Sequence, residues 1–277
     1  MNFKKIVGFL SIWVLVSCSS PLYNSVYQSV HVVADGKANE WSMPLDYFDS
    51  EAKIQYTFSN DRDNLYLCIK SADEQAQKKI INGGLQVWVD TTGKNKKQVG
   101  ILFPVGNDEK KESREERKNT IPSLKRSFFN TPKEMLLTGF KSPLRGLTSV
   151  QANNDIGINL NWDSVNTLTY EAIIPFKTFY KPVLALSDSL KVFGISVTIN
   201  GLTPPKDSEF SAKEANSGMP GGGAGGGGMP GARGMGGGGM GRTHAGASNP
   251  LFDSHTVKTK LQLAVKPKKN KSTLGAW

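Results

Sequence analysis

The chain has 277 residues, of which 38% are hydrophobic and 9% aromatic, and its formal net charge is +10. This hydrophobic content excludes a chain that is disordered throughout, because such chains have too few apolar side chains to form a core. The two cysteines, Cys18 and Cys68, exclude a framework of several disulfides. The positive charge by itself would suit nucleic acid, anionic lipid headgroups or phosphorylated glycans.

The N-terminus has the features of an export signal. Lys4 and Lys5 precede an apolar run over residues 6–16. This run is shorter than the ~20 residues that a membrane-spanning helix needs. A short apolar run after a basic start is typical of a secretory signal peptide. We therefore expect residues 1–17 to be removed on export.

The end of this signal resembles the site of lipid attachment in bacterial lipoproteins. Residues 15–18, Leu-Val-Ser-Cys, resemble the lipobox that the lipoprotein signal peptidase cuts. In that family the cysteine is acylated, and several acyl chains together hold a protein stably on a membrane. Cys18 is therefore the predicted lipid-attachment residue, and Ser19 resembles the residue that directs such proteins to the outer membrane. This resemblance implies a cell-envelope protein with a membrane as its partner, and not nucleic acid.

Period-two patterns predict strands through most of the mature chain. A polar tether is expected over residues 18–30, and alternating apolar and polar residues follow it, as on the two faces of a sheet. The predicted strands cover residues 31–33, 54–58, 65–69, 85–90, 99–103, 156–162, 168–174, 192–199 and 256–265. A short helix is predicted over residues 72–81. Cys68 lies within a strand pattern and is expected to be a small buried side chain.

Many short strands separated by turn signals predict an all-β fold. We expect one antiparallel β-sandwich over residues 31–265, with a few short helices. Residues 107–118 carry mixed charges and are expected to be a solvated helix or loop, and residues 119–147 are the least legible part of the sequence. Residues 217–247 are rich in glycine and methionine, have few side chains to bury, and are expected to be a disordered loop. A basic tail over residues 266–277 ends the chain.

Three motifs, in order, resemble family-9 carbohydrate-binding modules and their relatives. They are Asp35-Gly36 followed by Glu40-Trp41, the polar turn and strand over residues 60–67, and the strand over residues 85–90 that ends in an aspartate. The likeness covers residues 31–104. It implies a DOMON-like β-sandwich, a group whose members bind sugars, in some cases haem, and in many cases no known ligand.

The strand over residues 85–90 suggests a sugar-binding surface. Such sites combine an aromatic face with planar polar groups, and this strand places Trp88 on its polar side. We predict a ligand platform of residues from the polar sides of several strands: Trp88, Tyr66, Gln86, Asp90, Gln55 and Glu171. In the alternative interpretation, a loop or helix from residues 105–147 covers both aromatic side chains.

The other tryptophans and one turn residue have structural interpretations. Trp162 is in phase with the aliphatic residues of its strand, which favours core packing. Trp41 follows an Asp-Gly turn and is expected to plug one end of the sandwich. Asp35 is interpreted as a turn residue and not as a ligand.

Metal, haem and catalytic functions have weaker sequence support. Soft side chains near the glycine runs could suit Cu(I): Met219, Met229, Met235, Met240, His244 and His255. His31 and Met43 are the candidates if the domain binds haem as some relatives do. Because no hydrolase motif is present, we expect the protein to be non-enzymatic and to have no cofactor. We expect it to bind a carbohydrate or an envelope protein partner. The alternative is a structural or assembly lipoprotein without a small ligand.

Overall fold

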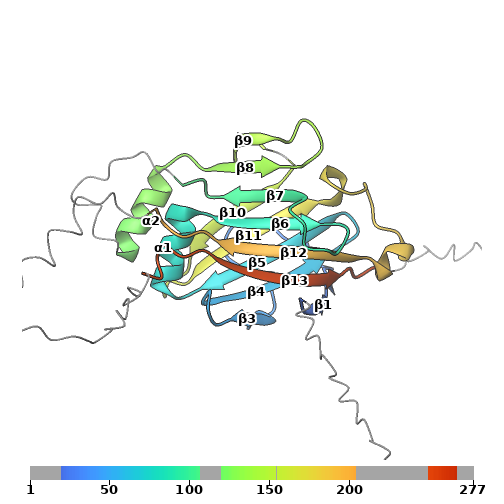
Figure 1. Cartoon of the computed structure of the whole chain (residues 1–277), viewed down its shortest axis with the longest axis horizontal. Coiled ribbons are helices and arrows are strands. Elements are labelled where there is room, and N and C mark those ends of the chain that lie inside the picture. Colours follow the sequence, from blue (N-terminus) through green and yellow to red (C-terminus); the bar gives the residue numbers. More distant parts are fainter. Residues whose placement is uncertain (1–19, 107–119, 154, 204–248, 267–277) are drawn as a thin grey trace, which may run out of the picture.

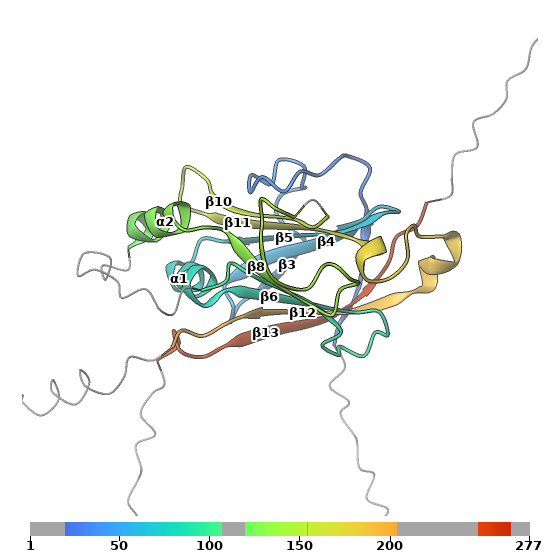
Figure 2. The ribbon, with the colours of Figure 1, turned by 90° about the horizontal axis from the view of Figure 1, so that it is seen from above.

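Two β-sheets packed face to face form the body of the protein. The computed structural model describes residues 20–106, 120–153, 155–203 and 249–266. Figure 1 shows the sheets with two α-helices at one end, and Figure 2 shows the two layers edge-on. The predicted all-β, sandwich-like fold is confirmed. Within the described ranges, no helix is both long and apolar enough to cross a membrane.

The first sheet has seven strands, in the order β1-β13-β12-β6-β7-β8-β9. Their bounds are β1 Leu22–Asn24, β6 Leu85–Asp90, β7 Val99–Phe103, β8 Glu134–Thr138, β9 Gly146–Ser149, β12 Val192–Ile199 and β13 His255–Gln262. All neighbours are antiparallel except β1 and β13, which are parallel.

The second sheet has six strands. Five follow the order β10-β11-β5-β4-β2, and β3 also pairs with β4. Their bounds are β2 Val26–Tyr27, β3 Tyr47–Asp49, β4 Ile54–Asn60, β5 Asn64–Ser71, β10 Gly157–Trp162 and β11 Leu168–Pro175. Here β2 and β4 form the parallel pair, and the other pairs are antiparallel.

The core lies between the sheets and follows the predicted alternation. In the β4–β5 hairpin, Ile54, Tyr56 and Phe58 are buried, whereas the intervening Gln55 is exposed. Val87 and Val89 of β6 belong to the same buried cluster. Burial of such side chains is the main favourable contribution to folding, at roughly 25 cal/mol per Å² of apolar surface.

The helices α1 (Glu74–Gly83) and α2 (Ile121–Asn130) close one end of the sandwich (Figure 1). The Asp73 side chain accepts a hydrogen bond from the Ala76 N–H at 2.8 Å and so caps the N-terminus of α1. The buried indole Nε1 of Trp162 donates to Gln77 Oε1 at 2.8 Å. This bond connects β10 to α1, and the predicted core position of Trp162 is confirmed.

Several predicted elements differ from the structure. Residues 22–27 form β1 and β2 where a tether was expected, because they hydrogen-bond to β13 and β4 at the sheet edges. Residues 31–33 form no strand. The region over residues 119–147, for which no element was predicted, contains α2, β8 and the start of β9. The predictions for Cys18, for residues 217–247 and for the tail after Lys266 lie outside the described residues.

Candidate functional site

Glu171 of β11 holds residues 32–45 against the six-stranded sheet and is buried beneath them. Its side chain points away from the core between the sheets, but residues 32–45 pack over this outer face and leave it 0% exposed. Its two carboxylate oxygens accept hydrogen bonds from the Gly36 N–H and from Trp41 Nε1, each at 2.7 Å. Burial raises the pKa of Glu171, and the two donated hydrogen bonds only partly oppose this shift.

Tyr66 of β5 lies under the same covering segment. It belongs to a small buried cluster with Val32, Trp41 and Cys68. Its hydroxyl donates to Asp61 Oδ2 at 2.6 Å, and burial followed by this bond raises the pKa of Tyr66. The buried position predicted for Cys68 is confirmed. Tyr66 therefore has a structural role in the hairpin turn.

The position of Trp41 corrects one prediction. Its indole covers the outer face of the six-stranded sheet and does not plug an end of the sandwich. The neighbouring turn is as predicted, because Asp35 Oδ1 accepts the Lys37 N–H at 2.9 Å. Gly36 has a φ of 78°, and a Cβ at this position would come within 2.5 Å of the Asn161 Cβ. Glycine is therefore required where the segment meets the sheet.

Trp88 and its two strand neighbours lie on the other sheet. The Trp88 side chain points to the outer face of the seven-stranded sheet, as predicted, but it is only 9% exposed. Its ring lies over Gly100 of β7, where a Cβ would come within 2.6 Å of the ring. Lys97 Nζ lies 5.7 Å from the ring centroid. Among the described residues, the indole Nε1 has no hydrogen-bond partner.

Asp90 holds the loop that follows β6. Its carboxylate accepts hydrogen bonds from the backbone N–H groups of Thr92, Lys94 and Lys96, at 2.8–2.9 Å, and from the Thr92 hydroxyl. Burial alone would raise the pKa of Asp90, but these donors outweigh it and the net shift is downward. Gln86 is half-buried on the same face of β6, on the other side of Trp88 from Asp90. The Asp90 carboxylate therefore holds the loop after β6 in place through these hydrogen bonds.

The structure does not form the predicted six-residue platform. Trp88, Gln86 and Asp90 belong to the seven-stranded sheet, whereas Tyr66, Gln55 and Glu171 belong to the six-stranded sheet. The polar sides of these strands therefore point out of opposite faces of the sandwich. Residues 32–45, and not residues 105–147, cover Tyr66.

Gln55 alone of the six lies exposed in a surface depression. This depression has a volume of about 430 Å³. Its lining residues come from β3, β4 and β5 and from the residues just before β4, α1 and β11: Phe48, Lys53, Gln55, Lys70, Ser71, Ala72, Asp73 and Thr167. Phe48 is 64% exposed, and its backbone pairs with Gln55 across β3 and β4. An open aromatic ring thus lies beside an amide and two lysines.

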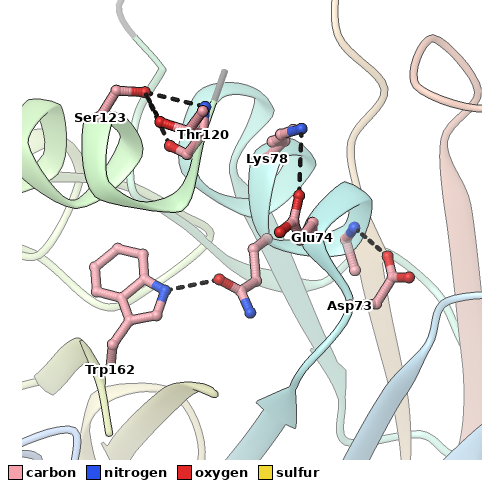
Figure 3. Close-up of polar contacts among 8 residues, drawn as sticks. Asp73, Glu74, Lys78, Thr120, Ser123 and Trp162 are labelled. Atoms are coloured by element: carbon pink, nitrogen blue, oxygen red, sulfur yellow. Dashed lines mark hydrogen bonds and ion pairs between the residues drawn. The ribbon is translucent and has the colours of Figure 1, made fainter. Parts of the chain in front are cut away.

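A second depression of about 500 Å³ shares Ala72 with the first. It lies between the starts of α1 and α2, and its lining includes Glu74, Lys78 and Thr120, whose side chains are drawn in Figure 3. Lys78 and Glu74 form an ion pair at 3.8 Å. The Ser123 hydroxyl accepts the Thr120 N–H at 3.2 Å, so the start of α2 is capped. We call the two depressions together the end groove.

Two neighbouring side chains fix the far wall of the end groove. Gln77 Nε2 donates to the Asn166 carbonyl at 2.8 Å, and Lys125 Nζ donates to Asn166 Oδ1 at 2.7 Å. Both bonds hold the turn between β10 and β11 in place, so the wall is already formed without a ligand. Gln77 is buried and also accepts from Trp162. Sequence patterns missed this groove because β3 has only three residues and shows no clear alternation.

The described part of the chain contains no site that supports the copper or the haem interpretation. There, no group of three or more His, Cys, Asp or Glu residues could hold a metal ion. His255 lies with one ring nitrogen 3.2 Å from Asp49 and the other 3.2 Å from Glu51. His31 and Met43 are both exposed in the segment before β3. The four methionines and His244 of the glycine-rich segment lie outside the described residues.

A comparison with models of known protein families found no match. A comparison with curated protein sequences also found none.

Proposed function

We propose that this protein is a non-enzymatic lipoprotein of the cell envelope that binds a glycan in the end groove. Lipid attachment at Cys18 would anchor it, and the Ser19 resemblance favours the outer membrane. The likeness to family-9 carbohydrate-binding and DOMON-like domains supports a sugar ligand. The sugar platform expected around Trp88 is replaced by a site on the opposite sheet.

The exposed ring of Phe48 beside Gln55 carries this proposal. The apolar face of a pyranose ring can stack on an aromatic side chain while an amide binds its hydroxyl groups. Phe48 and Gln55 are cross-strand partners, so ring and amide lie on one surface. Ser71, Asp73 and Thr167 line the same depression.

The charges of the groove favour an acidic glycan. Glu74 is paired with Lys78, and Asp73 caps α1. Neither Lys53 nor Lys70 forms an ion pair with any described residue. Two unpaired ammonium groups beside the aromatic ring suit uronate or phosphate groups on the sugar.

Calorimetry with acidic oligosaccharides tests the proposal. Aromatic stacking contributes about 0.5–1.5 kcal/mol beyond the area buried, so we expect Phe48→Ala to weaken binding about tenfold. Phe129→Ala is the matched control, because Phe129 is also an exposed aromatic residue but does not line the groove. Equal affinity of the Phe48→Ala variant and the wild type would refute the site.

A structural or assembly role is the second candidate. It is favoured by the covered Trp88 ring and by an apolar tip formed by Val183, Leu186 and Leu190, which are all exposed. Monomeric proteins seldom expose clustered apolar side chains without a partner. Replacing Leu186 and Leu190 with serine should then abolish assembly with an envelope protein and leave glycan binding unchanged.

A further inference from the structure

The first described residues are fastened to the seven-stranded sheet. The Pro21 carbonyl accepts the Lys260 N–H at 2.8 Å and the Thr259 hydroxyl at 3.0 Å. Strand β1 then pairs with β13, with Leu22 opposite Lys260. Ser20 Oγ accepts a hydrogen bond from Asn95 Nδ2 at 2.9 Å. The chain therefore joins the folded body at Ser20, beside the loop that follows β6.

This junction leaves almost no free chain before the lipid. Cys18 precedes Ser20 by two residues, and two extended residues span at most ~7 Å. A lipid on Cys18 would thus enter the bilayer within a few ångströms of the loop over residues 91–98. A domain held so closely must present one particular side to the membrane.

The loop beside Ser20 is basic. Lys94, Lys96 and Lys97 are exposed, and Asn95 folds back over Gly194 of β12. Lys258 and Lys260 of β13 lie on the outward positions of the same sheet face, opposite Ser196 and Gly194. These five lysines form what we call the basic half of this face.

Acidic groups do little to offset this charge. At the outward positions of the described strands of this sheet, the acidic residues are Asp90 and Glu134. The Asp90 carboxylate is buried beneath the loop, where backbone N–H groups surround it. The face therefore has a net positive charge, which suits an anionic bilayer surface.

The other half of the face is apolar. Leu102 of β7, Leu136 of β8 and Leu147 of β9 are directly paired across the three strands and form one row. Leu147 is 57% exposed, and Leu136 is also exposed. A row of leucines beside lysines is the arrangement of interfacial membrane-binding surfaces, in which apolar side chains enter the headgroup region.

We infer that the outer face of the seven-stranded sheet lies on the membrane and contacts anionic lipid headgroups through its lysines. The inference rests on the lipid anchor of the proposed function. The depression lined by Phe48 and Gln55 lies on the outer side of the six-stranded sheet. That sheet is the layer opposite the seven-stranded sheet (Figure 2). The glycan groove would then point away from the bilayer.

Fluorescent labels on the two faces test this orientation in the lipidated full-length mature protein. Leu147→Cys labels the proposed membrane face, and Asn39→Cys, an exposed position on the segment that covers the other sheet, is the matched control. Cys68 is fully buried, and burial raises the pKa of its thiol, so it should not react in the folded protein. Each variant carries an environment-sensitive dye and is reconstituted into phosphatidylethanolamine–phosphatidylglycerol vesicles that contain spin-labelled quencher lipid.

We expect the quencher lipid to reduce emission severalfold at position 147 and to leave position 39 unchanged. Each lysine near an anionic membrane raises partitioning by about fivefold. The difference in quenching between positions 147 and 39 should therefore become smaller when Lys94, Lys96 and Lys97 are replaced with glutamine. It should also become smaller when phosphatidylcholine replaces phosphatidylglycerol in the vesicles.

Three results would overturn the inference. Equal quenching at both positions in a protein with acylated Cys18 would remove the orientation but not the anchor. If the dye at position 147 is shielded from water in detergent without vesicles, and the protein has the mass of a dimer, the face would be assigned to a second copy of the chain. A mass spectrum without acyl groups on Cys18 would refute the anchor, and the orientation with it, while glycan binding measured by calorimetry would be unaffected.

Discussion

Replacing Glu171 with glutamine tests how the segment over residues 32–45 is held on the sheet. The carboxylate accepts one hydrogen bond on each oxygen, from the Gly36 N–H and from Trp41 Nε1. Glutamine has one oxygen acceptor and an NH₂ donor. One of the two buried N–H groups would therefore face another donor and lose its partner.

The magnitude follows from this loss. A hydrogen bond to a charged group contributes about 1.5–3 kcal/mol. Removing a buried charge regains part of this, because an ionised carboxylate is unfavourable away from water. We therefore expect Glu171→Gln to lower the free energy of unfolding by about 1–2 kcal/mol, and the Trp41 emission to shift toward that of a water-exposed indole.

The pH dependence gives a second, independent signature. Burial raises the pKa of Glu171 above its ordinary value of 4.5. Below that value the group is protonated in both the folded and the unfolded states. As the pH rises through the raised pKa, the folded state must hold a buried carboxylate, so this group's contribution to wild-type stability falls. The difference between wild type and Glu171→Gln should thus be largest in acid and smaller at neutral pH.

Urea unfolding followed by far-UV circular dichroism measures both effects, across a pH series from acid to neutral. The double variant with Trp41→Phe should lose less than the sum of the two single variants, because both changes act on the same pair of hydrogen bonds to residue 171. A Glu171→Gln variant as stable as the wild type throughout the series would refute the proposed clamp.

Two further substitutions probe the other sheet. Asp90→Asn should leave the Lys94 and Lys96 N–H groups without a carboxylate, cost about 2 kcal/mol, and speed hydrogen exchange across residues 92–97. The wild type should also lose Asp90's contribution as the pH falls through its lowered pKa, and unchanged exchange in the variant would contradict this role. Gly100→Ala should destabilise the fold by about 1–3 kcal/mol, because its Cβ would collide with the Trp88 ring; a melting temperature equal to that of the wild type would show that the ring moves freely.

Sequence patterns predicted the central strands well for a physical reason. The β4–β5 hairpin, β6, β11 and β12 each bury one side in the core between the sheets, so their apolar residues recur with a period of two. The pattern failed for β8, where Met135, Leu136 and Leu137 are successive apolar residues. Leu136 is exposed on the outer face and hides the alternation.

The edge strands were missed for a different reason. β1 and β2 have only three and two residues. They are held by parallel pairing with β13 and β4, which are distant in the sequence. Such short segments resemble a tether, because the local sequence does not reveal the distant strand with which each one pairs.

The candidate site could be predicted only in part, because alternation gives the side of a strand but not the sheet. Trp88 and Tyr66 were both placed correctly on the side away from the core between the sheets. Their strands belong to different sheets, so these sides face opposite directions. Gln55 was identified from its strand, whereas Phe48 needed the structure, since a three-residue strand carries no period.

A titration followed by nuclear magnetic resonance tests the central claim most directly. Isotope-labelled protein would be titrated with a panel of acidic and neutral oligosaccharides. We expect shifts from an acidic sugar to gather at Phe48, Gln55 and Lys70 and to leave the Trp88 indole signal in place. Shifts centred on Trp88, or no shifts with any glycan of the panel, would contradict a sugar site in the end groove.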